Sequence, residues 1–247
     1  MSTELPLYDT PDFFTAYQRM RADGDGLNEE LEQPALRALL PQVTGLDVLD
    51  LGCGDGGQAE WLASAGARSV LGVDPSTRML ALARGRAHPC LRYLQATAEE
   101  LTLPQASLDL VVSSLALHYV PDLPALLARI AQWLRPGGHL VYSVEHPVCT
   151  AQQPMNGWLE RPEGKVWPVT AYGDESARTQ RWFDTDVTKY HYKLSTHVGA
   201  LCSAGLILRA LDEPQPGPDA LVRRPDLAAH LIRPPLLLVA ARKPCSP

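Results

Sequence analysis

Three glycines after a buried apolar run, and one aspartate downstream of them, have the clearest potential for chemistry in this sequence. Gly52, Gly54 and Gly57 come directly after the apolar run at residues 48–51. Because glycine has no Cβ, the backbone can turn sharply there and approach a ligand, and the helix that follows offers unpaired N–H groups. Asp74 ends a second apolar run about twenty residues later, where its carboxylate can accept hydrogen bonds from both hydroxyls of a ribose. The pattern therefore indicates a site for a nucleotide-like ligand.

The three glycines also satisfy the dinucleotide fingerprint G-x-G-x-x-G, so an NAD(P)-dependent oxidoreductase is one interpretation. Such an enzyme would want a hydride-transfer partner, for example a Tyr-x-x-x-Lys pair on a helix. No such pair stands at the matching place in the sequence. The fingerprint alone leaves the ligand open.

Four signals in order along the chain resemble the motifs of class I S-adenosylmethionine-dependent methyltransferases of the type 11 group. Residues 50–56 (DLGCGDG), followed by residues 72–76 (GVDPS), resemble motif I and its acidic partner. Residues 96–101 resemble the adenine-side loop, residues 108–114 the fourth strand, and residues 134–140 the turn into the fifth. The resemblance implies S-adenosylmethionine as the cofactor and methyl transfer as the activity. A non-catalytic S-adenosylmethionine-binding protein is an alternative that would share every cofactor residue.

The resemblance also implies which residues hold the cofactor. They are Tyr17, Arg21, Asp50, Gly52, Cys53, Gly54, Asp74, Pro75, Ser76, Met79, Thr97, Ala98, Glu99, Ser114 and Leu115. Tyr17 and Arg21 would face the methionine end of the cofactor, with Arg21 paired to its carboxylate as a planar fork. The contact to the adenine amino group stays open between Thr97, Glu99 and the backbone around Ala98.

Methyl transfer from a sulfonium is an in-line displacement, so positioning can supply much of the rate. A general base is needed only where the acceptor must lose a proton. The candidates for a catalytic base are His118, just past the fourth strand, and Glu145 and His146 at the end of the fifth. We favour His146, because a residue at the sheet edge reaches an acceptor more easily. His118 could instead cap a helix, and the other two could orient the loop that begins at Pro147.

Alternating strand and helix patterns, together with the resemblance, predict an α/β fold: a Rossmann-like, seven-stranded, mostly parallel sheet with helices on both faces. Strands are expected at residues 47–51, 69–74, 91–95, 108–113, 139–145, 207–211 and 236–241. Helices are expected at residues 58–65, 76–87, 123–133 and 190–204. In the family that the sequence resembles, the last strand inserts antiparallel between its neighbours, and residues 236–241 are apolar enough for that central place.

We expect residues 1–247 to form a single class I methyltransferase domain with two additions. In residues 11–40, aromatic residues recur at helical spacing before a Gly-Asp-Gly break at residues 24–26. This segment is interpreted as an N-terminal helical lid over the cofactor, or as a helix that packs on the sheet. Residues 146–189 contain prolines that exclude one long helix and three of the five tryptophans, which disordered segments lack. We interpret this insert as a substrate cap, or else as cover for apolar surface.

The composition limits the partners. A net charge of −6 argues against a nucleic-acid partner, and a small neutral or cationic methyl acceptor is expected. No segment approaches the roughly 20 apolar residues that span a bilayer, so we expect a cytoplasmic protein with no membrane partner. The five cysteines are scattered and odd in number, which predicts free thiols. His191 and His197 are too far apart to share a helix face, so no metal is expected.

Overall fold

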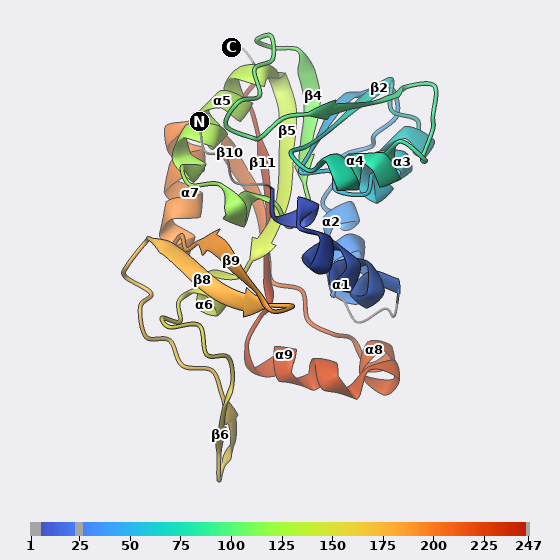
Figure 1. The fold of residues 1–247 in the computed structure, drawn as a ribbon. Coiled ribbons are helices and arrows are strands. Elements are labelled where there is room, and N and C mark those ends of the chain that lie inside the picture. The colour runs from blue at the N-terminus through green and yellow to red at the C-terminus, as the bar shows by residue number, and fades with distance from the viewer. Residues whose placement is uncertain (1–5, 23–26, 246–247) are drawn as a thin grey trace.

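A seven-stranded sheet sets the position of the other elements. The structure is a computed structural model that describes residues 6–22 and 27–245. Within these residues the strand order is β10-β11-β5-β4-β1-β2-β3 (Figure 1). The strands are β1 (Asp47–Leu51), β2 (Ser69–Asp74), β3 (Leu91–Gln95), β4 (Leu108–Ser113), β5 (Leu134–Glu145), β10 (Ile207–Asp212) and β11 (Leu236–Arg242).

The strands from β3 to β5 run parallel, and β11 runs antiparallel between β5 and β10. Val48 of β1 lies opposite Val70 of β2 and Leu110 of β4. β11 begins with Leu236 opposite Glu145 of β5. The predicted antiparallel insertion is thereby confirmed. The carboxyl ends of the parallel strands meet at one edge of the sheet, which is where open α/β folds bind ligands.

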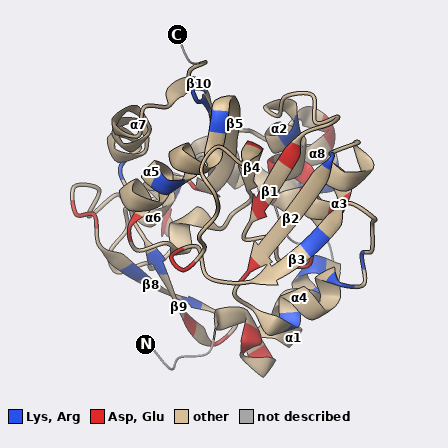
Figure 2. Ribbon diagram, turned by 90° about the horizontal axis from the view of Figure 1, so that it is seen from above, with Lys and Arg blue, Asp and Glu red and all other residues tan. Residues whose placement is uncertain are grey.

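Helices cover both faces of the sheet, as predicted. On one face lie α5 (Leu123–Trp133) and α7 (Leu194–Ser203), and on the other lie α2 (Gln33–Ala38) and α3 (Gly57–Ser64) (Figure 2). The helix α4 (Thr77–Ala83) contacts β2 and β3. Figure 2 also shows Lys and Arg interspersed with Asp and Glu around the fold.

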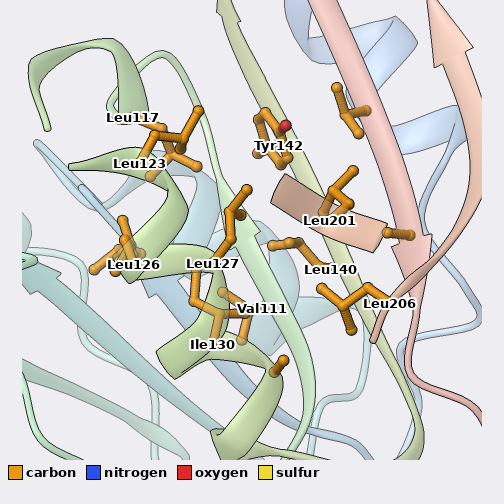
Figure 3. Close-up of a cluster of buried hydrophobic side chains, with 14 of the residues drawn as sticks. Val111, Leu117, Leu123, Leu126, Leu127, Ile130, Leu140, Tyr142, Leu201 and Leu206 are labelled. Atoms are coloured by element: carbon orange, nitrogen blue, oxygen red, sulfur yellow. The ribbon is translucent and has the colours of Figure 1, made fainter. Parts of the chain in front are cut away.

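The larger apolar cluster fills the space between the sheet and the helices α5 and α7 (Figure 3). Its labelled members are Val111, Leu117, Leu123, Leu126, Leu127, Ile130, Leu140, Tyr142, Leu201 and Leu206. Burying one such leucine stabilises the fold by about 1.5–3 kcal/mol relative to leaving it exposed. The helix α5 begins where Asp122 Oδ1 accepts a hydrogen bond from the Ala125 N–H at 3.0 Å. The cap and the apolar face together fix α5 beside the ends of β4 and β5.

One predicted helix is wrong at its start. The structure begins α7 at Leu194, whereas the pattern predicted a helix over residues 190–204. Tyr190 instead belongs to a strand and pairs with Ala177. The helical spacing at residues 190–193 is therefore misleading, because Tyr190 pairs with a strand of the insert that no local sequence pattern predicts.

Two further boundaries shift, while the remaining strands and helices agree with the prediction to within a residue. The strand β5 starts at Leu134 instead of at residue 139, because Leu134 pairs with Leu108 across a register shift. The helix predicted over residues 76–87 begins at residue 77 and ends at Ala83.

The N-terminal segment forms short helices beside the edge where the parallel strands end. They are the 3-10 turn η1 (Leu7–Asp9), α1 (Pro11–Ala22) and the π-helical turn η2 (Asn28–Glu32). The predicted break at residues 24–26 lies outside the described residues. Phe13 of α1 is buried, and its ring meets that of Trp182 edge-on with centroids 5.4 Å apart. The N-terminal helix therefore packs on the insert as well as beside the sheet.

The insert after β5 is a helical turn followed by two hairpins. Its elements are α6 (Pro147–Thr150), β6 (Leu159–Arg161), β7 (Gly164–Val166), β8 (Ala177–Trp182) and β9 (Thr185–Tyr190). Arg178 is 1% exposed and donates to the carbonyl oxygens of Thr150 at 3.1 Å and Ala171 at 3.2 Å. This buried guanidinium ties the hairpin β8–β9 to the start of the insert.

The C-terminal helices α8 (Pro218–Arg223), η4 (Pro225–Ala228) and α9 (Ala229–Ile232) precede β11. Figure 1 shows α1, the β8–β9 hairpin and the α8–α9 segment gathered beyond the carboxyl end of β5. In the described part of the chain, no helix has the length and apolar character needed to cross a bilayer.

Candidate functional site

A cavity of about 1290 Å³ lies at the carboxyl ends of β1, β2, β4 and β5. All of the residues predicted to hold the cofactor line it: Tyr17, Arg21, Asp50, Gly52, Cys53, Gly54, Asp74, Pro75, Ser76, Met79, Thr97, Ala98, Glu99, Ser114 and Leu115. His118 and Glu145 also line the cavity, whereas His146 does not. Met155, Trp167, Gln180 and Trp182 of the insert line it too. One cavity thus joins the glycine turn to the insert.

The glycine turn after β1 has the backbone shape that its sequence predicts. Gly52 and Gly54 have φ angles of +77° and +53°, in the left-handed region that favours glycine. The N–H of Gly52 donates to the carbonyl oxygen of Val73 at 2.8 Å, which fixes the turn to β2. A Cβ on Gly52 would lie 2.2 Å from the Cβ of Ala116, but one on Gly54 would meet no protein atom within 4 Å. Gly52 is therefore required for packing, and Gly54 leaves space beside the cavity.

Asp74 joins the turn to the next helix. Its Oδ2 accepts the N–H of Gly54, and its Oδ1 accepts the N–H of Ser76, both at 2.9 Å. Burial raises the pKa of Asp74, and these two hydrogen bonds oppose the rise. Each carboxylate oxygen can accept a further hydrogen bond. Asp74 can therefore receive ligand hydroxyls from the cavity while it holds the turn.

Asp9, which the sequence analysis did not single out, caps α4 from the N-terminal segment. Its Oδ1 accepts from Ser76 Oγ at 2.6 Å and from the Arg78 N–H at 3.0 Å. Its Oδ2 accepts from the N–H and the hydroxyl of Thr77 at 3.1 and 2.9 Å. An anion at a helix N-terminus is favourable, so this contact ties the N-terminal helices to the Asp74 strand. The separation of nearly seventy residues left no local signal for it.

Asp50 is fully buried on the cavity wall, and neither carboxylate oxygen has a hydrogen-bond partner of normal geometry among the described residues. Burial, reinforced by the carboxylates of Asp74 and Glu32, raises the pKa of Asp50 to about 8, and the backbone N–H of Ala59 opposes this only weakly. A buried carboxylate without a partner is costly. A cationic ligand group would satisfy it.

Arg21 of α1 reaches the cavity from the N-terminal side. Its Nη2 forms an ion pair with Glu29 at 2.9 Å, while its buried Nη1 has no partner among the described residues. The ring of Tyr17, one helical turn earlier, lies 5.0 Å from that of Tyr8. The guanidinium therefore keeps one donor free for a ligand anion.

The predicted adenine-side loop is held from α5. Arg129 donates to the carbonyl oxygens of Ala98 and Glu99, each at 2.6 Å. The hydroxyl of Thr97 accepts the N–H of Glu100 at 3.2 Å. Arg129 therefore positions this loop. Nothing in the sequence indicated this contact, because an arginine on the surface of a helix usually faces solvent.

Glu32 of η2 performs a similar bridging role. Its Oε1 accepts from Ser114 at 2.9 Å and from Ser143 at 2.6 Å. Burial raises its pKa, although both hydroxyls and Gln33 oppose the shift. This buried network fixes Ser114 on the cavity wall. The sequence did not predict it, because Glu32 lies among other charged residues and its partners are more than eighty residues away.

The three candidate bases have different surroundings. His118 is buried, its Nδ1 has no partner among the described residues, and burial lowers its pKa to about 4. Burial acts to raise the pKa of Glu145, but Lys189 and His118 outweigh it, so the pKa lies below its usual value. The Nζ of Lys189 donates to Glu145 and to Gln180.

The preference for His146 is not supported by its position. Its Nδ1 accepts the N–H of Val148 at 3.0 Å, which caps α6, and its Nε2 lies 2.7 Å from Glu213. Both ring nitrogens are therefore engaged, and the ring is absent from the cavity wall. The alternative in which His146 orients the insert fits these contacts.

No group of three or more His, Cys, Asp or Glu side chains is placed to hold a metal ion in the part of the chain that the structure describes. The five cysteines at positions 53, 90, 149, 202 and 245 are free.

The stability of the protein without ligand should depend on pH through Asp50. Between its ordinary pKa of 3.8 and about 8, the folded protein keeps a proton on Asp50 that the unfolded chain has lost. The free energy of unfolding therefore falls as pH rises through this window, by up to about 1.4 kcal/mol per pH unit for one proton. Asp50→Asn cannot ionise, so its unfolding free energy should exceed that of the parent near pH 8 and approach it near pH 4.

Denaturant unfolding at several pH values measures this difference. Asp12→Asn is the matched control, because Asp12 is an exposed acidic residue in the first turn of α1. The control should follow the parent. Parallel curves for the parent and Asp50→Asn would contradict the assignment.

Comparison with known proteins places this geometry in a family. The model of the methyltransferase domain matches residues 49–142, which include the glycine turn, Asp74 and the adenine-side loop. A solved S-adenosylmethionine-dependent methyltransferase from Mesorhizobium loti is 43% identical, with a TM-score of 0.83, and the match covers 88% of this chain and 100% of that one.

Two other relatives differ in how much of the chain they share. An uncharacterized protein of Haemophilus influenzae is 32% identical over 98% of this chain and 99% of its own length. Trans-aconitate 2-methyltransferase of Deinococcus radiodurans is 44% identical, but over only 44% of this chain and 42% of its own length. The match to that curated relative thus spans less than half of it.

These matches overturn the oxidoreductase interpretation of the glycine fingerprint and confirm the predicted cofactor class, S-adenosylmethionine. The chain belongs to the family of S-adenosylmethionine-dependent methyltransferases.

Proposed function

We propose that this protein transfers a methyl group from S-adenosylmethionine to a small-molecule acceptor. The observation that carries the proposal is the single cavity that joins the glycine turn to the aromatic insert. Its volume of about 1290 Å³ exceeds the roughly 300–1,000 Å³ of a usual ligand pocket, which leaves room for cofactor and acceptor together. We propose no nucleic-acid or membrane partner. A cytoplasmic location stays a prediction from the sequence.

The residues on the cavity wall fit the chemical groups of the cofactor. Asp74 would accept the ribose hydroxyls, and the unpartnered carboxylate of Asp50 would face the ammonium group. The free donor of Arg21 would bind the methionine carboxylate, with Tyr17 beside it. The open space at Gly54 would admit the ligand against the backbone. When bound, S-adenosylmethionine supplies the electrophilic methyl group.

On the adenine side, we propose that Arg129 holds the loop backbone so that Thr97, Ala98 and Glu99 frame the base. The carbonyl oxygens of Ala98 and Glu99 already accept from Arg129. The exposed carboxylate of Glu99 forms no hydrogen bond or ion pair with the described residues, so we assign the adenine amino contact to Glu99.

We propose that residues 11–40 form a lid over the cofactor and that residues 146–189 cap the acceptor. The edge-on contact of Phe13 with Trp182 supports this, because it joins the two segments above the cavity. Closing the cavity in this way would exclude water and orient the acceptor. The alternatives are that residues 11–40 only pack on the sheet and that residues 146–189 only cover apolar surface. These alternatives explain why Phe13 is buried, but they do not explain why side chains of the insert line the cavity.

For an acceptor that must lose a proton, we propose His118 as the general base in place of His146. His118 is neutral at pH 7, and its free Nδ1 can accept a proton. Glu145 is held by Lys189, so we propose that it affects catalysis only through its electrostatic effect on the pKa of His118.

The glycine turn gives a test of the cofactor site. Gly54→Ala should weaken S-adenosylmethionine binding at least tenfold, because the added methyl group would occupy ligand space. The free energy of unfolding should fall by only about 1–2 kcal/mol, which is the cost of a left-handed φ for alanine. Calorimetric titration with S-adenosylmethionine and denaturant unfolding measure the two effects. Gly45→Ala is the matched control, since Gly45 has a φ of +78° and equally open surroundings but lies outside the cavity wall. Equal affinities in both variants would contradict the proposed site.

The function itself is tested by transfer of labelled methyl groups from S-adenosylmethionine into a bacterial small-molecule extract. Labelled products should appear with the parent protein, and their absence would contradict the proposal. With the acceptor isolated, kcat of the parent should be level between pH 6 and 8 and fall only toward pH 4, where His118 takes up a proton.

For a hydroxyl or amine acceptor, His118→Ala should lower kcat by about 10² to 10⁴, the usual cost of losing a general base. His88→Ala, which changes a histidine outside this cavity, is the control and should keep the parental kcat. If kcat of the parent rises with pH between about 6 and 7, and His146→Ala lacks this rise, His146 would be the general base instead.

A further inference from the structure

Arg233 occupies an unusual position at the insert end of the cavity. The side chain lines the cavity wall, yet the residue is only 9% exposed. Its guanidinium carbon lies 4.0 Å from the ring centroid of Trp167 and 5.2 Å from that of Trp158. Two indole rings therefore hold the guanidinium in place through cation–π contacts.

The guanidinium is not paired directly with a carboxylate, although the charge of Arg233 contributes to the lowered pKa of Glu145. Among the described residues Arg233 forms no ion pair, and its buried Nε has no hydrogen-bond partner. Its Nη1 contacts the sulfur of Cys149 and the carbonyl oxygen of Pro234. Burial raises the pKa of the Cys149 thiol to about 12, so that neighbour is neutral.

The charges around Arg233 leave a positive surplus. Glu145 is the carboxylate that lines this end of the cavity, and its ion pair is with the buried Lys189. Glu213 forms a hydrogen bond with His146, whose pKa is lowered by burial, and its half-exposed carboxylate is screened by solvent. His230 on α9 also lines the cavity, and burial lowers its pKa. The two buried cations Arg233 and Lys189 thus share one partly buried carboxylate, that of Glu145.

We propose that the methyl acceptor carries a carboxylate group and that Arg233 binds it through its free donors. This inference rests on the proposed function, because it assigns a substrate class to the same cavity. A buried cation without a counter-ion is costly, and a ligand carboxylate would supply both the charge and the acceptor atoms for Nε. The proposed acceptor is then an anion, unlike the neutral or cationic molecule expected from the composition.

The geometry favours a carboxylate over a phosphate. The two indole rings beside the guanidinium meet edge to face at 74°, and the guanidinium carbon lies nearer to the Trp167 ring. The planar fork of guanidinium donors matches the two oxygens of a carboxylate. Arg233 and Lys189 together carry one positive charge more than Glu145 neutralises, and one ligand carboxylate would balance it. A phosphate monoester carries nearly twice that charge at pH 7.

The experiment measures ligand binding to the protein loaded with S-adenosylhomocysteine. The probes are a panel of aromatic and aliphatic carboxylic acids, each paired with its primary amide and, for the aromatic scaffolds, its phosphate ester. Calorimetry gives the affinity, and tryptophan fluorescence reports contact with the Trp158 and Trp167 rings. The parent should bind carboxylates in preference to their amides and phosphates. A parent that shows no such preference for any scaffold overturns the proposal, and a preference for the phosphates reassigns the anion.

Variants localise the effect. Arg233→Gln should weaken carboxylate binding by about 10- to 100-fold, as expected for the loss of charge-assisted hydrogen bonds, and leave amide binding unchanged. Arg233→Lys, which keeps the charge without the fork, should lose less and guards against a folding defect in the glutamine variant. Arg161→Gln, which removes an exposed arginine from the insert, is the control. Parental carboxylate affinity in Arg233→Gln would contradict the proposal.

Affinity for S-adenosylhomocysteine should stay within a few fold of the parent in all of these variants. Loss of carboxylate selectivity with this affinity intact bears on Arg233 alone. Failure of the parent to bind S-adenosylhomocysteine would refute the proposed function instead.

Discussion

The buried carboxylate of Asp74 is the interaction on which the rest of the site depends. It accepts one backbone N–H from the glycine turn and one from the start of α4, so it fixes the distance between β1 and β2 at their carboxyl ends. Asp9 then binds the same helix start through Ser76, which brings the N-terminal helices to this point. Hydrogen bonds to a charged acceptor contribute about 1.5–3 kcal/mol each, more than neutral pairs. The N-terminal helices, the glycine turn and the start of α4 are thus coupled at one carboxylate.

The cavity wall has acidic side chains at one end and a guanidinium at the other. Asp50 and Asp74 lie at the cofactor end, where a bound ammonium group would favour the ionised form of Asp50, whereas Arg233 lines the insert end. A cofactor that carries a sulfonium and an ammonium suits the first end, and an anionic acceptor suits the second. Charges in a buried site are poorly screened, so this arrangement would orient both ligands toward the junction of the two halves.

The sheet could be read from the sequence because its strands are apolar runs separated by glycine and proline signals. The residues predicted to hold the cofactor followed from the resemblance to the methyltransferase motifs, and every one of them lines the cavity. Contacts between distant segments could not be read in this way. Asp9 on Ser76, Glu32 on Ser143 and Arg129 on the adenine-side loop each depend on tertiary placement.

The same limit explains the two clear differences. The hydrogen bond of His146 to Glu213 spans sixty-seven residues and could not be read from the sequence, whereas its local contact with Val148 agrees with the alternative that His146 orients the loop at Pro147. Tyr190 was assigned to a helix because its strand partner, Ala177, lies in an irregular insert without a clear alternating pattern. The strands and helices with strong local signals were placed correctly, and the start of α7, which is fixed by long-range pairing, was not.

The most direct test of the account is the affinity of S-adenosylhomocysteine for Asp74→Asn, measured by calorimetry beside the parent. Asparagine keeps the size of the side chain but loses the charge and one acceptor atom, so both the ribose contact and the turn should weaken. We predict a dissociation constant raised by about 10- to 100-fold, which corresponds to about 1.5–3 kcal/mol. An unchanged dissociation constant in a folded variant would contradict the central role of Asp74.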